Sequence, residues 1–300
     1  MTHMDKKKVL LADLSLILVA ALWGGGFVAV KDALNNIGPY YLMAMRFSLA
    51  AILLGVVFFK KMKTIKKSDL KGGTIVGVFL FLAFAFQTVG LQYTTASKQS
   101  FLTAVYVVIV PFLYWGITKK APGLYNIVSA FLCLFGVGLL TLDGGLSLGI
   151  GDSLTLVCAI FFAGHIVSVG HYAQKVDPII LTVLQFVVSA VISLGCAIFL
   201  DTPPATMGKE VIFPILYLAV FSTLICYVIQ NVAQKYTYST HAALIMSTEA
   251  VFGTILSVLI LSDEVGAKLI IGCILIFIAI IISETELKFL RKKKSETLDR

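Results

Sequence analysis

The stretch PYYLMAMRF (residues 39–47) returns in altered form as PIILTVLQF (residues 178–186). Each stretch opens a hydrophobic segment with proline and ends on a polar residue followed by phenylalanine. A second pair of matching triplets begins at Gln92 and at Lys235. Because the offset between the copies is nearly the same in both pairs, they predict a chain built from one duplicated unit.

The loops that follow the two copies differ in charge. Residues 60–71 contain six lysines, whereas the counterpart 201–210 contains one lysine and two acids. Lys and Arg gather on the cytoplasmic side of a membrane, so these equivalent loops are expected to face opposite sides. A repeat that is inverted in a membrane is the architecture of many secondary transporters.

The composition places the chain in a bilayer. Of its 300 residues, 59% are hydrophobic and 13% are charged, against about 25% charged in soluble domains. The net charge of +8 comes from short loops and tails between apolar segments, where it suits lipid headgroups, and no nucleic-acid partner is predicted. The five cysteines lie inside apolar segments without metal-ligand spacing, so neither a disulfide set nor a metal site is expected.

Ten apolar segments are long enough to cross the hydrocarbon core, which takes about 20 residues. The first lacks a small-residue cleavage pattern and is kept as a span rather than a signal peptide. A cytoplasmic N-terminus places 19 Lys and Arg residues inside and 4 outside, which favours an even number of spans and both termini in the cytoplasm. The predicted spans are 10–31, 39–59, 72–93, 98–118, 123–142, 151–172, 178–200, 211–234, 240–261 and 266–285.

The expected fold is therefore an all-α integral membrane protein of ten transmembrane helices, arranged as two inverted five-helix repeats around a central cavity. Residues 1–9 form a cytoplasmic N-terminus, 10–143 the first repeat, 151–285 the second, and 286–300 a basic cytoplasmic tail. The expected location is the cytoplasmic membrane, which is the inner membrane in a cell that has two.

Several short motifs resemble EamA-type transporters of the drug/metabolite transporter superfamily. They are ALWGGGF (21–27), MRF (45–47), FLTAVY (101–106) with Pro111, STEAVF (247–252) and LSDE (261–264). The resemblance covers about residues 10–285. It implies that helices 1–4 and 6–9 surround a cavity, that helices 5 and 10 lie at the edge, and that the chain exports small metabolites such as amino acids.

The sequence departs from the family pattern at two places. Phe162–Ala163 stands where the first half has Trp-Gly, and Ala250 follows Glu249 where the family commonly has proline. Neither departure changes the fold that the resemblance implies, but both leave the substrate open.

Polar residues inside a bilayer are costly and face the bundle interior or water. Several fall on one face of a predicted helix, as a central cavity requires, although hydrogen bonding between helices would explain them equally. The candidate substrate-binding residues are Trp23, Arg46, Gln87, Gln99, Thr103, Tyr106, His165, Gln185, Tyr227, Gln230, Asn231 and Glu249.

Two of these candidates, Glu249 and Arg46, are charged, and a different role is predicted for each. Glu249 is suited to carrying a proton, binding a cationic group or pairing with Arg46, and the plain alternative is a fixed ion pair or a cap on broken backbone. The planar fork of Arg46 suits a carboxylate or phosphate. Its alternative is snorkelling to the outer interface.

Gating residues are predicted from position. Lys98 and His241 are repeat mates, and inversion would place them at opposite ends of the cavity, as gates or as plain interfacial residues. Pro111 is expected to kink its helix and to act as a hinge. Glu249 is the candidate for coupling.

We therefore expect a secondary carrier that works by alternating access on a zwitterionic solute, with carriage of nucleosides, nucleobases or amines as the alternative. The sequence contains no Walker-type loop, so direct ATP drive is excluded, and no cofactor is predicted. Proton coupling and plain exchange stay open, as does packing of helices 5 and 10 on lipid or in a homodimer. A membrane enzyme is disfavoured by scattered histidines and short loops, and an assembly factor by the polar stripes.

Overall fold

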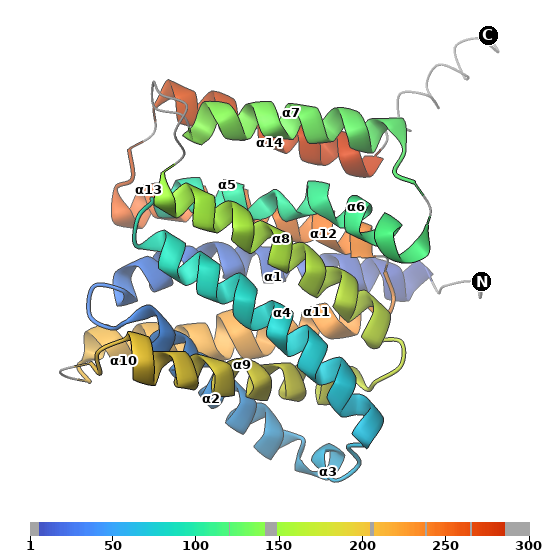
Figure 1. The fold of residues 1–300 in the computed structure, drawn as a ribbon, viewed down its shortest axis with the longest axis vertical. Helices are drawn as coiled ribbons and strands as arrows, with labels where there is room; N and C mark the ends of the chain where they lie inside the picture. The colour runs from blue at the N-terminus through green and yellow to red at the C-terminus, as the bar shows by residue number, and fades with distance from the viewer. Residues whose placement is uncertain are drawn as a thin grey trace.

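The computed structural model describes residues 6–119, 121–141, 149–204, 207–237, 239–264 and 266–285. These residues form an all-helical bundle without strands (Figure 1). The helices are α1 Lys6–Ala33, α2 Pro39–Val57, α3 Phe59–Met62, α4 Lys67–Leu91, α5 Ala96–Ala104, α6 Tyr106–Thr118, α7 Leu124–Thr141, α8 Ile150–Tyr172, α9 Pro178–Leu200, α10 Lys209–Tyr217, the π-helix η1 Leu218–Ile225, α11 Cys226–Ala233, α12 Ser239–Ser247, α13 Glu249–Leu261 and α14 Ala267–Thr285.

Eight helical segments in the described part of the chain are long and apolar enough to cross a membrane. They lie at Leu10–Ala33, Pro39–Val57, Lys67–Leu91, Ala96–Gly116, Ile150–Tyr172, Pro178–Leu200, Lys209–Ala233 and Ala242–Leu261. Two shorter apolar helices, Ile127–Leu139 and Ala267–Ile282, occupy the fifth and tenth predicted spans.

Helices α2 and α9 begin with proline, which is favoured in the first turn because it has no N–H to leave unpaired. The carboxylate of Asp201, just after α9, accepts hydrogen bonds from Tyr40 N and Tyr41 N at 2.7 and 2.9 Å, and so caps α2. At the opposite end, Asp177 caps α9 through Ile179 N and Ile180 N and pairs with Lys61 at 2.7 Å. The two helices thus run antiparallel, and their termini contact each other at both ends.

Two of the predicted helices are interrupted at equivalent positions. The helix predicted over 98–118 breaks at Val105, between α5 and α6, and the helix predicted over 240–261 breaks at Thr248, the corresponding position of the second half. Pro111 loosens the first, because it offers no N–H to the preceding turn. In the second, Ser247 Oγ and Thr248 Oγ1 donate to the carbonyls of Leu244 and Ile245, a pattern that bends helices.

The helix predicted over 211–234 is divided by a π-helical turn, η1. A π-helix has one more residue in each hydrogen-bonded turn than an α-helix, and such turns occur frequently at functional sites. This segment contacts α1 and α2, and it was not visible in the hydropathy pattern.

Glycines bring α1 close to its neighbours. A Cβ at Gly24 would lie 2.5 Å from Phe252 Cβ, and one at Gly26 would lie 2.9 Å from Ser222 Oγ. The close packing that three successive glycines allow therefore fixes α1 against α13 and η1.

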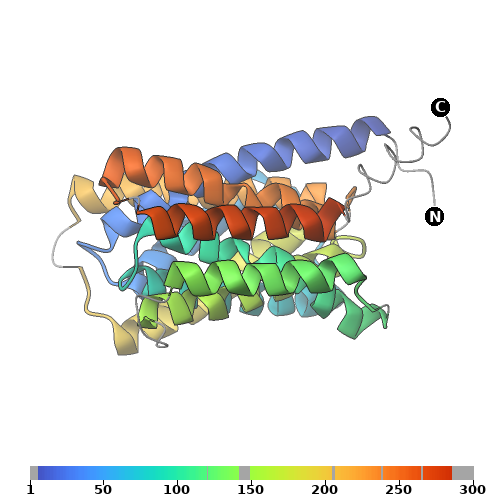
Figure 2. The ribbon, with the colours of Figure 1, turned by 90° about the horizontal axis from the view of Figure 1, so that it is seen from above.

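Helices α7 and α14 lie side by side at one edge of the bundle (Figures 1 and 2), where they contact α5, α6 and α12. Their axes approach closely because Gly136 faces Gly272 O and Ile276. The first turn of α1 and the last turn of α14 lie at the same end of the bundle (Figure 2).

Candidate functional site

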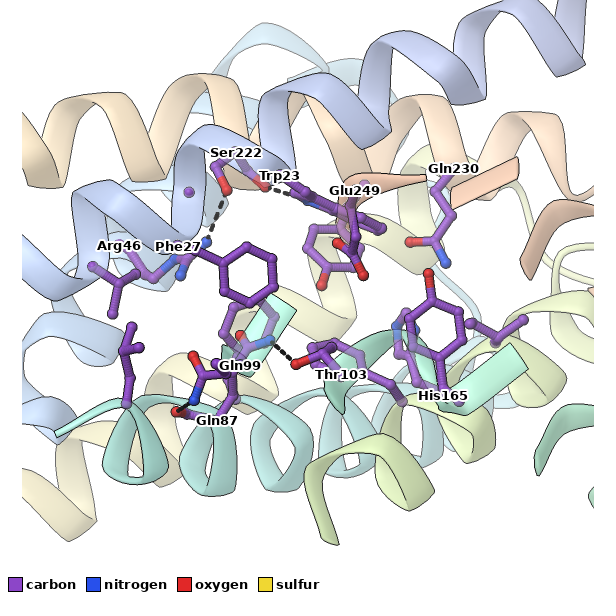
Figure 3. Close-up of a pocket in the computed structure, with 18 residues that line it drawn as sticks. Trp23, Phe27, Arg46, Gln87, Gln99, Thr103, His165, Ser222, Gln230 and Glu249 are labelled. Atoms are coloured by element: carbon purple, nitrogen blue, oxygen red, sulfur yellow. Dashed lines mark hydrogen bonds between the residues drawn. The ribbon is translucent and has the colours of Figure 1, made fainter. Parts of the chain in front are cut away.

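A cavity lies among the central helices (Figure 3). Its empty volume is about 570 Å³, solvent at its mouth included. Ten of the twelve candidate binding residues line it: Trp23, Arg46, Gln87, Gln99, Thr103, Tyr106, His165, Tyr227, Gln230 and Glu249. The lining comes from α1, α2, α4, α5, α6, α8, η1, α11 and α13.

Arg46 is 1% exposed, so it does not snorkel to the interface. Its Nε and Nη2 donate to Thr223 Oγ1 at 2.9 and 2.8 Å, and Nη2 reaches Ser222 Oγ at 3.5 Å. The guanidinium carbon lies 4.5 Å from the centre of the Phe84 ring, a cation–π contact. No carboxylate of the described residues forms an ion pair with Arg46, so its charge is held by hydroxyls and an aromatic face.

Glu249 is 4% exposed and begins α13 at the helix break. Its repeat mate, Tyr106, begins α6 at the other break. The Tyr106 hydroxyl lies next to the Glu249 carboxylate without completing a hydrogen bond of good geometry. The expected alternative of an Arg46–Glu249 ion pair is not observed, and Figure 3 shows the two side chains at separate places in the cavity, Arg46 beside Ser222.

Amide groups supply further polar atoms to the cavity. Gln99 Nε2 donates to Gln87 O at 2.7 Å, and Gln87 Nε2 to Thr103 Oγ1 at 3.3 Å. Gln230 Nε2 donates to Gln234 Oε1 at 3.2 Å. The carbonyl oxygens Oε1 of Gln99 and Gln230 have no hydrogen-bond partner among the described residues. Both oxygens are buried, so they are unsatisfied acceptors in the wall of the cavity.

Trp23 is fixed by its ring nitrogen, which donates to Ser222 O at 2.8 Å, and its ring lies 5.2 Å from that of Tyr227. The nitrogen is occupied, so Trp23 offers the cavity an aromatic face.

Two candidates lie behind the cavity wall. Gln185 is buried, and its Oε1 lies 2.8 Å from Nε2 of His165, which does line the cavity. Asn231 donates to Thr182 Oγ1 at 2.7 Å and so joins α11 to α9. Their direct contact with a substrate stays a prediction.

Eight further residues line the cavity: Gly26, Phe27, Val30, Phe84, Leu91, Phe162, Ile166 and Ser222. The internal repeat contained a signal for two of them. Phe162 is the mate of Trp23 at the offset of the two proline-led stretches, and Phe84 is the mate of Tyr227 at the offset of the matching triplets. Apolar residues in a hydrophobic helix give no other sign of facing a cavity.

Two of the candidate gating residues, Lys98 and Pro111, do not line the cavity. Lys98 pairs with Asp152 at 2.6 Å in a largely buried contact that joins α5 to α8. Asp152 also accepts a hydrogen bond from Thr94 Oγ1 at 2.9 Å. Pro111 is half-buried in α6. The side chain of His241 lies outside the described residues.

Comparison with known proteins identifies the family. The EamA-like transporter family matches the chain twice, over residues 10–142 and 149–285. The chain belongs to the EamA-like transporter family. It is accordingly a multi-pass membrane protein of a transporter family, and the name of the family indicates a transporter rather than an enzyme.

Relatives agree with this assignment. An uncharacterized transporter of Archaeoglobus fulgidus is 37% identical over 275 residues, which cover 92% of this chain and 86% of that protein. A probable amino-acid metabolite efflux pump of Escherichia coli K12 is 24% identical over 93% of this chain and 96% of that protein. One crystal structure has the same fold at a TM-score of 0.69 and 15% identity, and the match covers 95% of this chain and 99% of the other.

Proposed function

We propose that this protein is a secondary carrier that exports small zwitterionic metabolites, such as amino acids, across the cytoplasmic membrane. The observation that supports this proposal is that a basic residue, Arg46, and an acidic residue, Glu249, are buried in one cavity without an ion pair between them. An uncompensated charge at membrane depth is expensive and marks a functional site. A solute with one carboxylate and one ammonium group would supply a partner for each.

The cavity wall supports the same class of solute. The amide side chains of Gln99 and Gln230 line the cavity, and the Trp23 and Tyr227 rings add aromatic faces that attract cations. Phe27 and Phe84 give apolar surface for a side chain. This combination also suits an amine without a carboxylate, which is the second candidate substrate because Glu249 and the aromatic rings alone would bind it.

Alternating access is proposed from the internal repeat. The family matches each half of the chain separately, and the breaks at Val105 and Thr248 lie at equivalent places in the two halves. We propose ten crossings in two inverted five-helix repeats, with both termini in the cytoplasm. The cavity then lies between the halves, and rocking of one against the other would expose it to each side in turn.

The direction of transport and its coupling to protons are proposed on separate grounds. Export is proposed because the Escherichia coli relative is named as a probable amino-acid metabolite efflux pump. Glu249 is proposed to exchange a proton for the ammonium group of the substrate, because one buried carboxylate cannot satisfy both at once.

The test is counterflow in proteoliposomes that contain the purified protein. Vesicles are preloaded with each of the twenty amino acids, or with a matched amine, and uptake of the same radiolabelled compound is followed. We expect transient accumulation for a subset of the amino acids and none in vesicles without protein. If only the amines accumulate, the substrate is the second candidate, an amine without a carboxylate. If no compound accumulates in vesicles that contain folded, inserted protein, the proposed transport function is rejected.

A further inference from the structure

Two adjacent residues of the π-helical segment η1 hold side chains that line the cavity. Ser222 O accepts the hydrogen bond from the Trp23 ring, and Thr223 Oγ1 accepts two from Arg46. One turn of helix therefore positions side chains of α1 and α2 together. Gly26 allows α1 to approach, since a Cβ there would lie 2.9 Å from Ser222 Oγ.

The contact at Thr223 leaves one edge of the guanidinium free. Nε and Nη2 both point to the single oxygen of Thr223, and no described residue accepts a hydrogen bond from Nη1. The Phe84 ring covers one side of the group at 4.5 Å. A guanidinium has five N–H donors in a fixed plane, so holding one edge and one face determines where the remaining donors point.

We propose that Thr223 is a positioning residue that sets carboxylate selectivity in this carrier through Arg46. Thr223 is buried with 0% exposure and does not line the cavity, so it acts on the substrate only through the guanidinium that it holds. The inference rests on the proposed function, since it names the part of the cavity that recognises the carboxylate of a zwitterion.

The chemistry follows from the hydrogen-bond inventory. Threonine Oγ1 has two lone pairs, and both are directed to Arg46 when it accepts from Nε and Nη2. A valine of the same shape has no acceptor and would leave two buried donors unsatisfied. The guanidinium would then turn toward other acceptors, and a carboxylate would meet it in a less favourable geometry. A serine keeps the oxygen and should keep the geometry.

The experiment measures binding of matched compounds to purified protein by isothermal titration calorimetry. For each amino acid that binds the wild type, the set contains that amino acid and the amine that lacks its carboxylate, for example L-leucine and 3-methylbutylamine. Thr223→Val should raise the Kd of the amino acid about tenfold, the effect expected if the displaced guanidinium loses one charge-assisted hydrogen bond to the carboxylate of the substrate. The Kd of the amine should change less than twofold, and Thr223→Ser should restore amino-acid binding.

Thr182→Val is the matched control for burial. Thr182 is fully buried, accepts from Asn231 and lies outside the cavity lining. The variant should lose thermal stability as Thr223→Val does, while the ratio of the two Kd values stays at the wild-type value.

The possible outcomes separate the role of Thr223 from the proposed function of the protein. An unchanged ratio in Thr223→Val, with the wild type binding amino acids, would overturn the role of Thr223 and leave the proposed function intact. Equal weakening of amino acid and amine would show that Thr223 supports the cavity in general and would also overturn it. If the wild type binds no amino acid, the proposed function fails, and the inference falls with it.

Discussion

At the scale of single residues, Glu249 provides the first prediction. Glu249→Gln keeps the size of the side chain and removes the charge that the cavity otherwise holds unpaired. We expect at least a tenfold loss of transport and of binding for compounds with an ammonium group, because charge-assisted hydrogen bonds are about twice as strong as neutral ones. Proteoliposome uptake and calorimetry measure the two effects.

The control for this substitution is Glu210→Gln, because Glu210 is exposed in the first turn of α10. It should leave uptake unchanged. If Glu249→Gln transports at the wild-type rate at every pH, Glu249 has no part in coupling, and the charge serves the structure alone.

The sequence predicted most of the cavity lining because polar residues in an apolar helix have few other reasons to be present. It could not separate Gln230 from Asn231, which are adjacent and differ in direction by about 100° around the helix. Gln230 lines the cavity, and Asn231 points to Thr182 on α9. Gln185 was predicted to face the cavity as one of the polar residues on a helix face, but it lies behind His165. The position of a neighbouring helix decides such cases, and one sequence does not contain it.

At the scale of helices, close packing of α1 provides the second prediction. Gly24→Ala would place a Cβ 2.5 Å from Phe252 Cβ and 2.8 Å from Gly253 N. Because one of these neighbours is backbone, the contact cannot relax by a rotamer change. We expect a loss of about 1 to 3 kcal/mol, the usual cost of overpacking, as a lower midpoint of thermal unfolding in detergent.

Gly55→Ala in α2 is the matched control, since a Cβ there would meet nothing within 4 Å. Alanine favours the helix over glycine, so this variant should be as stable as the wild type or more so. An unchanged midpoint for Gly24→Ala would mean that α1 and α13 do not pack as described.

The cap of α9 provides the third prediction. Burial raises the pKa of Asp177, but the Lys61 ammonium and the Ile179 and Ile180 N–H groups lower it more, and the net pKa falls below the ordinary 3.8. A lowered pKa adds stability that is present above 3.8 and is lost as the pH falls through the folded-state value. Asp177→Ala should therefore cost about 1 kcal/mol at pH 7, typical for losing an N-cap.

The same variant gives a pH signature. The difference in unfolding midpoint between wild type and Asp177→Ala should narrow as the pH is lowered below 3.8, because the wild-type carboxylate is then protonated. A difference that stays constant over that range would assign the effect to packing rather than to charge.

Hydropathy located the helices to within a few residues but not their interruptions. The break at Thr248 depends on hydroxyl groups that donate to the preceding turn. The π-helix η1 coincides with contacts to Trp23 and Arg46, which lie 199 and 177 residues away in the chain. Pro111 was the one local signal, and the break that it accompanies lies earlier, at Val105. Breaks set by distant side chains leave no mark on local periodicity.

At the scale of the whole molecule, the inverted topology provides the fourth prediction. In a variant without native cysteines, single cysteines at Lys63 and at Thr202 test the two equivalent loops, both of which are exposed. A membrane-impermeant maleimide should label Thr202→Cys in intact cells and Lys63→Cys only after permeabilisation. The reason is that five proposed spans, an odd number, separate the two sites, and one of the five is α7, whose apolar core is short.

Labelling of both sites from the same side would contradict the inversion, because it would require an even number of crossings between them. Comparable expression of the two variants, measured by labelling after detergent solubilisation, is the control. The sequence predicted this topology from lysine distribution alone.

The exchange of caps between α2 and α9 has a consequence for synthesis. The donors at Tyr40 and Tyr41 wait for an acceptor 161 and 160 residues further along the chain, which a ribosome takes roughly 8 to 30 seconds to add. Until then, the N-terminus of α2 lacks the cap that Asp201 provides. If the second half entered with the wrong polarity, Asp201 would emerge on the far side of the membrane and Lys61 would find no acid. In the proposed topology, these contacts between α2 and α9 can therefore form only when both halves have inserted with the expected polarity.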